Sequence, residues 1–528
     1  MTDGPGTLRD RVDAALGQAI AYLPRDKTVA DLRHLLEDHR RRFPAPMRVA
    51  LVGRVSAGKS TLANALLGGR FAATGRTELT YNVNWFRNAA TAELTIHYKA
   101  GGAERVAQPT VEALIARTAR GRDGDPRFLA TIDYLEFAHP NARLKAFDLI
   151  DTPGLESVYV ADSANALRFL GLDEEGVRVT NAQHTERANA VVHVLPKPSS
   201  AREYALLGDF LSAAPGKTTP VKAVGALTKI EDEWSPDQCD VMAAGRVLAK
   251  RLMDGGMNRK LYDLRPVAGL VGQAAATLTT EEFDDLCALA LRADPATLVR
   301  QVKYGNRFGR ADSRELPVPP QRRGSLFDRL GAFGITLSCD LIRGGVADRD
   351  TLCGELFERS GLAAFHRLLV DHFGARADLI KLQDVIADVE AQAEKSVAAL
   401  RGPAGARTRI AVERARAEMI QMAYRERGLD ELDVVHKYYA GELSFSETDA
   451  QEALRIVGEH GTSPRQRLGL PPIASTAELI ASAHRARRHW AMLIDSPDGR
   501  GGATGGACRV VQRSLDALIE ELSPSVSR

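Results

Sequence analysis

The sequence predicts an α/β domain with a doubly wound, mostly parallel sheet, joined to a large all-α helical bundle. Two observations predict this fold class. Between residues 46 and 275, short apolar runs alternate with helical patterns, as in sheets whose strands are buried on both faces. After Leu278 strand patterns nearly vanish, and helical spacing continues almost to the end. We therefore expect N-terminal helices over 1–45, the α/β domain over 46–275 and a helical trunk over 276–528.

The composition narrows the class of protein. The chain has 528 residues and a formal charge of +2, with 44% hydrophobic and 26% charged residues. This balance argues against a dedicated nucleic-acid binder, which would be strongly basic, and against a disordered chain. Five cysteines lie at wide, irregular spacing without a CxxC pair, so we expect free thiols in a reducing cytoplasm. We expect neither a signal peptide nor a membrane-spanning segment.

The N-terminal half reads as helices followed by strands. Residues 8–42 predict two short amphipathic helices, broken near Pro24. The first strand, 47–52, is apolar apart from Arg48 and is followed directly by Gly53. The other expected strands lie at 91–98, 131–137, 144–150, 189–195, 221–227 and 265–271, and helical patterns lie between them at 200–213 and 236–253.

The C-terminal half reads as helices with one long interruption. A helix is expected from Glu281 to about Val302, followed by an exposed Gly/Pro/Arg-rich loop over 305–325. Farther on, mostly apolar residues recur every three or four positions along one helix face. This spacing favours the buried seam of an intramolecular bundle over an intermolecular coiled coil. The members of this stripe are Leu379, Leu382, Ile386, Val389, Ala393, Ser396 and Leu400.

The most specific motif follows the first strand. Residues 53–61, GRVSAGKST, match G-x-x-x-x-G-K-[ST] between a buried strand and a helical pattern. Backbone amides in such a loop wrap phosphates at a helix N-terminus, Lys59 lies between the β and γ phosphates, and the Ser60 hydroxyl ligates Mg²⁺. The expected nucleotide contacts are Gly53, Ser56, Ala57, Gly58, Lys59, Ser60 and Thr61.

Two further segments suit the γ-phosphate side of such a site. Asp151-Thr-Pro-Gly154 ends another apolar strand, where the aspartate would support the Mg²⁺ shell and the Gly154 amide would sense the γ-phosphate. The hydroxyl-rich segment 74–80 suits a switch loop, with Thr80 as the metal-contacting and catalytic hydroxyl and Thr77 as second choice. The alternatives are an ordinary turn and a solvated loop.

The base would be read after the strand 221–227. Thr228-Lys229-Ile-Glu231-Asp232 resembles the N/T-K-x-D motif of GTPases, in which the lysine stem covers the base and the carboxylate accepts hydrogen bonds from guanine. Glu231 holds the expected aspartate position and Asp232 follows it, so either carboxylate can serve. We expect guanine to be preferred over adenine. A weaker candidate is a last base-contacting loop over 269–273.

These four motifs, in this order, resemble those of the bacterial dynamin-like large GTPases. The 92-residue interval from Lys59 to Asp151 is similar to the enlarged dynamin G domain, and residues 49–68 and 73–83 resemble the P-loop and first switch of that family. The resemblance implies a Mg²⁺-dependent hydrolase that converts GTP to GDP. It also implies nucleotide-dependent G-domain pairing, as a homodimer or with a paralogue, that moves helical bundles, often at the inner face of the cell membrane.

Two positions depart from the family pattern. Dynamins commonly carry a glutamine two residues after the first P-loop glycine, where this chain has Val55, although Ser56 matches the next position. Leu155 follows Gly154, where signalling GTPases carry glutamine. Neither side chain can orient water, so we expect slow basal turnover that depends on Ser56, Thr80, backbone groups or a partner subunit.

The membrane half of the resemblance has two candidate contacts. These are the basic run His484-Arg-Ala-Arg487-Arg488-His-Trp490 and the loop 305–325, with Arg307, Arg310, Arg322 and Arg323. Anionic lipid would attract such clusters; the alternative is a solvated or salt-bridged bundle surface. Two other functions remain open: an Era-like regulatory GTPase whose helical part binds a protein partner, and a nucleotide-binding scaffold or ATPase with weak hydrolysis.

Overall fold

The computed structural model describes most of the chain. The described residues are 7–54, 56–69, 71, 83–106, 131–152, 188–198, 220–237, 240–309, 316–374, 376–400, 405–439, 441–459, 461–495 and 501–523.

The described strands form one nine-stranded mixed sheet, in the order β4-β3-β5-β2-β6-β1-β7-β8-β9. Strand β1 lies between β6 and β7 and is parallel to both, and β8 and β9 continue the parallel part, whereas β2 joins β6 antiparallel. The strands are β1 (Met47–Val52), β2 (Val83–Asn88), β3 (Glu93–Tyr98), β4 (Ala103–Val106), β5 (Ile132–His139), β6 (Phe147–Asp151), β7 (Ala190–Pro196), β8 (Ala223–Thr228) and β9 (Leu264–Pro266). The expected α/β fold class is confirmed.

The helices make up most of the rest. They are α1 (Leu8–Tyr22), α2 (Ala30–Arg42), α3 (Lys59–Leu67), α8 (Val241–Asp254), α9 (Gly269–Thr277), α10 (Thr280–Arg292), α11 (Pro295–Lys303), α12 (Gly305–Phe308), α13 (Pro320–Arg343), α14 (Arg349–Arg359), α15 (Leu362–Leu369), α16 (Ala377–Ala399), α17 (Ala406–Arg425), α18 (Arg427–Tyr439), α19 (Glu447–Ile456), α20 (Pro464–Leu468), α21 (Thr476–Asp495) and α22 (Gly502–Leu522).

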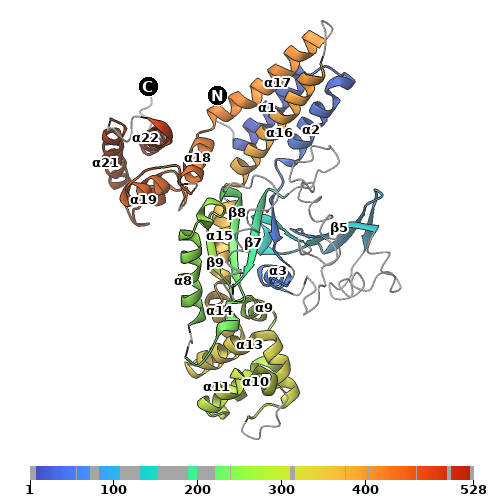
Figure 1. Cartoon of the computed structure of the whole chain (residues 1–528), viewed down its shortest axis with the longest axis vertical. Helices are drawn as coiled ribbons and strands as arrows, with labels where there is room; N and C mark the ends of the chain where they lie inside the picture. Colours follow the sequence, from blue (N-terminus) through green and yellow to red (C-terminus); the bar gives the residue numbers. More distant parts are fainter. Residues whose placement is uncertain are drawn as a thin grey trace.

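Helices from both ends of the chain form one bundle. The two expected N-terminal helices, α1 and α2, pack with α16 and α17 around a shared core that includes Leu16, Leu36, Leu382 and Met419. Figure 1 shows this bundle at one end of the molecule. The stripe over 379–400 supplies Leu382, Val389, Ala393 and Leu400 to that core, so the prediction of an intramolecular seam is confirmed.

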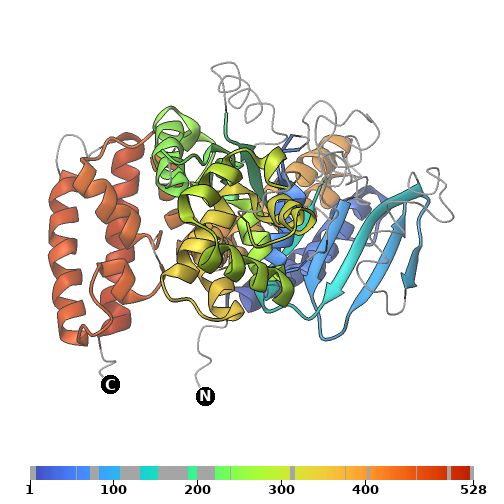
Figure 2. The same ribbon diagram turned by 90° about the horizontal axis from the view of Figure 1, so that it is seen from below.

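A second core lies at the other end. Helices α8 to α14 pack against β8 and β9 through residues such as Leu227, Leu286 and Leu330, and Figure 1 places α10, α11 and α13 opposite the bundle. The single helix expected over 281–302 is two helices, because Pro295 begins α11 and the Asp294 side chain caps it. Figure 2 shows α18–α22 on the side away from strands β2–β5, and core residues of these helices belong to the same apolar cluster as those of β1.

The loop expected over 305–325 is largely helix. Short α12 occupies 305–308 and α13 begins at Pro320, while residues 310–315 lie outside the described residues. Arg323 is 1% exposed and donates to the carbonyls of Phe308 and Val318, while Arg322 pairs with Asp285. Arg323 is therefore not available to a membrane, and that expectation is wrong for it, whereas Arg322 is ion-paired but its side chain is 41% exposed. Arg310 lies outside the described residues, as does the side chain of Arg307.

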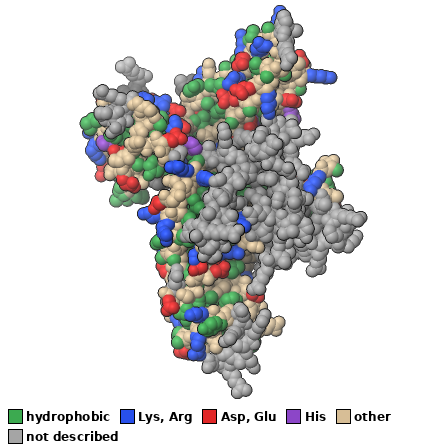
Figure 3. All heavy atoms as spheres, in the orientation of Figure 1, with side chains coloured by type: hydrophobic (Ala, Val, Ile, Leu, Met, Phe, Trp, Pro, Cys, Tyr) green, Lys and Arg blue, Asp and Glu red, His purple; other side chains and the backbone are tan. Residues whose placement is uncertain are grey.

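The surface mixes both signs of charge. Figure 3 shows basic and acidic side chains interspersed over the bundle and the C-terminal helices, as a formal charge of +2 leads one to expect. In the other proposed membrane contact, Trp490 is fully buried, Arg487 pairs with Asp516 and His489 pairs with Asp449. Trp490 is therefore not available to a membrane, and two of the five basic side chains of this run are held in ion pairs with neighbouring helices.

Candidate nucleotide site

The phosphate loop connects β1 to α3. Ser56 and Gly58 have left-handed backbones, with φ of 60° and 96°, and Gly58 precedes α3 without a side chain that caps the helix. The first amides of α3 are thus left to an anion, which the helix dipole also favours. A Cβ on Gly53 would lie 2.6 Å from the Val194 carbonyl oxygen, so only glycine lets the loop leave β1 beside β7.

Lys59 spans this loop from the start of α3. Its Nζ donates to the carbonyls of Gly53 at 3.1 Å and of Arg54 at 3.0 Å, and the side chain is 7% exposed. The ammonium group is thus held at the mouth of the loop, where it can exchange the carbonyls for phosphate oxygens. Ala57, Ser60 and Thr61 are placed on the same loop and helix, as the motif predicts.

A hydroxyl and a carboxylate meet beside the loop. Ser60 Oγ donates to Asp151 Oδ2 at 3.0 Å, and Asp151 ends β6, fully buried. Asp151 Oδ1 is buried and has no hydrogen-bond partner among the described residues. Burial raises the pKa of Asp151 to about 6, against the charge of Lys59 and the Ser60 bond, which lower it. An orphaned oxygen beside a serine hydroxyl is a donor set that suits Mg²⁺.

The structure does not describe the segments that the sequence predicts to be switches. Thr74–Thr80, with Thr77 and Thr80, lie outside the described residues, and so do Val55, Gly154 and Leu155. The neighbouring Thr152 is described and buried, and its hydroxyl donates to the Leu51 carbonyl at 2.7 Å. That bond fastens the exit of β6 to β1, next to the phosphate loop. Nothing in the sequence singled out Thr152 for this positioning role.

The base-reading motif is fastened to the phosphate loop. Thr228, at the end of β8, donates its hydroxyl to the Ala57 carbonyl at 2.7 Å, with the Leu195 carbonyl at 3.3 Å. Lys229 follows in a left-handed backbone, with φ of 59°, and its side chain is exposed. A short 3₁₀ turn, η5 (Ile230–Glu233), then reverses the chain. The motif therefore lies beside the P-loop, where a base attached to bound phosphates would extend.

The two candidate carboxylates differ in environment. Glu231 is 6% exposed, and its Oε1 accepts from the Leu270 amide at 3.0 Å, whereas Asp232 is exposed. Glu231 Oε2 is buried without a hydrogen-bond partner among the described residues. Burial raises the pKa of Glu231 to about 7, opposed by hydrogen bonds from the backbone of Leu270 and Gly269. Glu231 is therefore the carboxylate with an unused buried acceptor.

The last expected strand and loop need correction. The strand predicted over 265–271 covers only Leu264–Pro266, and residues 269–273, predicted as a base-contacting loop, are the first turns of α9. The Ala268 amide donates to the Ser360 carbonyl at 2.9 Å, so the chain turns into a helix directly after β9. The contact of α9 with Glu231 was missed, because an apolar run of this length fits a strand or a helix equally well.

Residues 49–204 match the family model described as the dynamin family. The isoniazid-induced protein IniC of Mycobacterium tuberculosis, from strain CDC 1551 / Oshkosh and from strain ATCC 25618 / H37Rv, is 31% identical over 526 residues. That similarity covers 97% of this chain and 99% of IniC.

Solved structures resemble the chain only remotely. One, titled as an oligomerised bacterial dynamin pair for long-range sensing and tethering of membranes, has a TM-score of 0.33 and 12% identity, and the match covers 99% of this chain and 91% of that one. Another, Aquifex aeolicus Era bound to GDP and aluminium fluoride, has a TM-score of 0.21 and 15% identity, with 44% of this chain and 54% of that one covered.

Proposed function

Because this chain belongs to the dynamin family and is a GTPase, we propose that it acts as a Mg²⁺-dependent, nucleotide-driven switch whose hydrolysis cycle moves the helical bundle. The observation that carries this proposal is the convergence of Lys59, the Ser60–Asp151 pair and Glu231 around one loop. A phosphate cation, a metal-suited donor pair and a buried base acceptor are the three parts that nucleotide chemistry needs.

The residues would divide the work as follows. Lys59 would leave the loop carbonyls and bind oxygens of the β and γ phosphates, while amides at the start of α3 hold the remaining charge. Ser60 and Asp151 would hold Mg²⁺, with Thr80 as a proposed further ligand. Bound there, the cation would neutralise charge that develops on the β–γ bridge. Gly154 would report the γ-phosphate to the segment that follows it.

Water activation is the incomplete part of the proposed site. Val55 and Leu155 carry no group that can orient water, so Ser56, Thr80 or a second G domain must supply it. A paired G domain would complete the site only at concentrations at which the chains associate, and turnover by the isolated chain would be slow.

The decisive test is turnover of GTP and ATP over a hundredfold range of protein concentration, with Mg²⁺ and with EDTA. We expect hydrolysis of GTP only, abolished by EDTA, with specific activity that rises with concentration as G domains pair. A flat specific activity would contradict pairing as the source of the missing group. Equal rates with ATP would contradict the base assignment and favour the scaffold or ATPase alternative.

Peripheral binding to anionic membrane is the second part of the proposal. No helix in the described part of the chain is long and apolar enough to cross a membrane. On α21, Trp490 of the basic run is buried, and Arg487 and His489 are ion-paired. Two arginines of the run, Arg485 and Arg488, are exposed and lie one turn apart. Anionic lipid attracts each such residue by about 1 kcal/mol.

Reversing these two charges should therefore weaken binding to liposomes. We expect Arg485→Glu with Arg488→Glu to lower co-sedimentation with anionic vesicles at least tenfold and to leave GTP turnover in solution unchanged. The matched control reverses two exposed cations of α8, Arg246→Glu with Lys250→Glu. If the native chain pellets with no vesicle in any nucleotide state, the membrane proposal is wrong and the alternative of a protein partner gains support.

A further inference from the structure

The two oxygens of the Glu231 carboxylate have different surroundings. One oxygen, Oε1, accepts from the Leu270 amide at the N-terminus of α9, and the other, Oε2, is buried without a partner among the described residues. A carboxylate offers two oxygens with about four acceptor positions in total. The backbone of α9 already uses one side of this group, which leaves a single oxygen for a ligand.

The α9 helix is fixed at both ends, so the carboxylate cannot turn away from it at low cost. At its start, the Ala268 amide is bonded to the Ser360 carbonyl, and a Cβ on Gly269 would lie 3.4 Å from Thr61 of α3. At its end, Arg329 donates to the Thr277 carbonyl at 2.8 Å and to the Thr277 hydroxyl at 2.6 Å.

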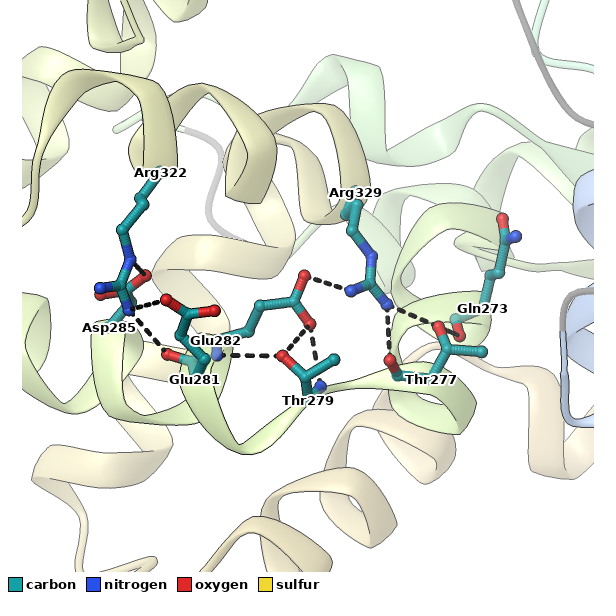
Figure 4. A network of polar contacts seen from close by, with 8 residues as sticks. All are labelled: Gln273, Thr277, Thr279, Glu281, Glu282, Asp285, Arg322 and Arg329. Carbon is teal, nitrogen blue, oxygen red and sulfur yellow. Dashed lines mark hydrogen bonds and ion pairs between the residues drawn. The ribbon is translucent and has the colours of Figure 1, made fainter.

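Figure 4 shows how that end is anchored. Arg329 also pairs with Glu282, which caps α10 through Thr279, and Arg322, two turns earlier on the same face of α13, pairs with Asp285. The Thr277 hydroxyl in turn donates to the Gln273 carbonyl at 2.9 Å within α9. Helices α9, α10 and α13 are thus joined by polar contacts, and the amide that holds Glu231 belongs to a helix anchored to its neighbours.

The length of the side chain allows this division. An aspartate at position 231 would be one methylene shorter and could not reach the Leu270 amide from the same backbone position. Glutamate reaches it, and in doing so gives up one of the two oxygens that a free carboxylate would present to a base. The substitution of Glu for Asp in the motif is thereby coupled to the helical start of residues 269–273.

We propose that this site reads a purine through one carboxylate oxygen and so binds 6-oxopurine nucleoside triphosphates without selecting for the 2-amino group. Guanine presents two adjacent donors, N1–H and the 2-amino group, whereas hypoxanthine presents N1–H alone and adenine presents an acceptor at N1. A single oxygen takes the N1–H of guanine and of hypoxanthine alike and repels adenine. The inference rests on the proposed nucleotide site.

Competition binding tests it directly. A fluorescent GTP analogue is displaced from the full chain by GTP, ITP or ATP in Mg²⁺ buffer. We expect the affinities for GTP and ITP to agree within about threefold, and ATP to bind far more weakly. A second charged hydrogen bond, at about 1.5–3 kcal/mol, would instead favour GTP over ITP by roughly 10- to 150-fold, and a preference of tenfold or more would overturn the inference.

Variants separate this inference from the proposed function. Glu231→Asp frees the carboxylate from α9, so the preference for GTP over ITP should rise to tenfold or more; an unchanged ratio would contradict the role of α9. The control is Asp237→Asn, an exposed carboxylate just after η5, which should leave both affinities unchanged. Far-ultraviolet circular dichroism checks that each variant folds. If no triphosphate binds the native chain, the proposed nucleotide site itself fails.

Discussion

Replacing Lys59 with alanine should lower single-turnover GTP hydrolysis by about a thousandfold or more. The side chain is buried, and its ammonium group donates to the carbonyls of Gly53 and Arg54 at the rim of the phosphate loop. Removing it leaves the β and γ phosphates without their nearest fixed cation in a water-poor site, where a single charge has a large effect.

Two measurements identify the cause of that loss. Fluorescent-nucleotide binding should weaken together with hydrolysis, because the lysine contacts phosphate in the ground state as well. Lys250→Ala removes an exposed lysine of α8 and should change neither quantity. If Lys59→Ala retains native turnover, the phosphate-site assignment is wrong, whatever the standing of the base-reading motif.

The phosphate loop could be located from the sequence because its chemistry is local. Within nine residues, the motif specifies the left-handed glycine, the lysine and the hydroxyl, and its position after an apolar strand fixes which end of the sheet it occupies. The meeting of Ser60 with Asp151 followed from the same rule, since parallel β1 and β6 end at one edge. The motif and the sheet topology therefore predict the same position for the phosphate loop.

Other features could not be predicted because they depend on distant partners. The run 265–271 has no periodicity that separates strand from helix, and the outcome is decided by the Ser360 carbonyl, 92 positions away. Strand β2 was missed because its sequence, VNWFRN, mixes polar and apolar residues and takes its place only by pairing with β5 and β6. Arg323 counted as a surface charge until the carbonyls that bind it were known.

The helical bundle was likewise predictable from the sequence only in part. Spacing along 379–400 predicted a buried seam, and the N-terminal helices were expected to join the helical part, but only the structure shows that α1, α2 and α17 are the partners of this seam. The chain therefore connects the bundle to the sheet twice: it leaves the bundle at Phe43 to enter β1, and it returns at Arg376 to begin α16. Lys381 joins the two crossings, since its Nζ donates to the carbonyls of Phe43 and Ala45. In the proposed cycle, this junction would be one route by which the G domain moves the bundle.

Arg376 is the most costly residue to remove at that junction. Its guanidinium donates to His372 Nδ1 at 2.9 Å and to the Gly458 carbonyl at 2.7 Å, and His372 Nε2 donates to the Val221 carbonyl at 2.7 Å. Burial and the Arg376 charge lower the pKa of His372 to about 3, so the ring is neutral and can accept from the arginine. The network joins the segment before β8, the entry to α16 and the end of α19.

Arg376→Ala should therefore lower the free energy of unfolding by about 3–5 kcal/mol, because it leaves two buried acceptors without donors and opens a cavity. Urea denaturation followed by tryptophan fluorescence measures the change. Arg367→Ala, which removes an exposed arginine paired with Glu358, is the control and should cost less than about 0.5 kcal/mol. A loss below 1 kcal/mol for Arg376→Ala would mean that the polar network does not hold the G domain to the bundle, and that the coupling must pass through the apolar contacts alone.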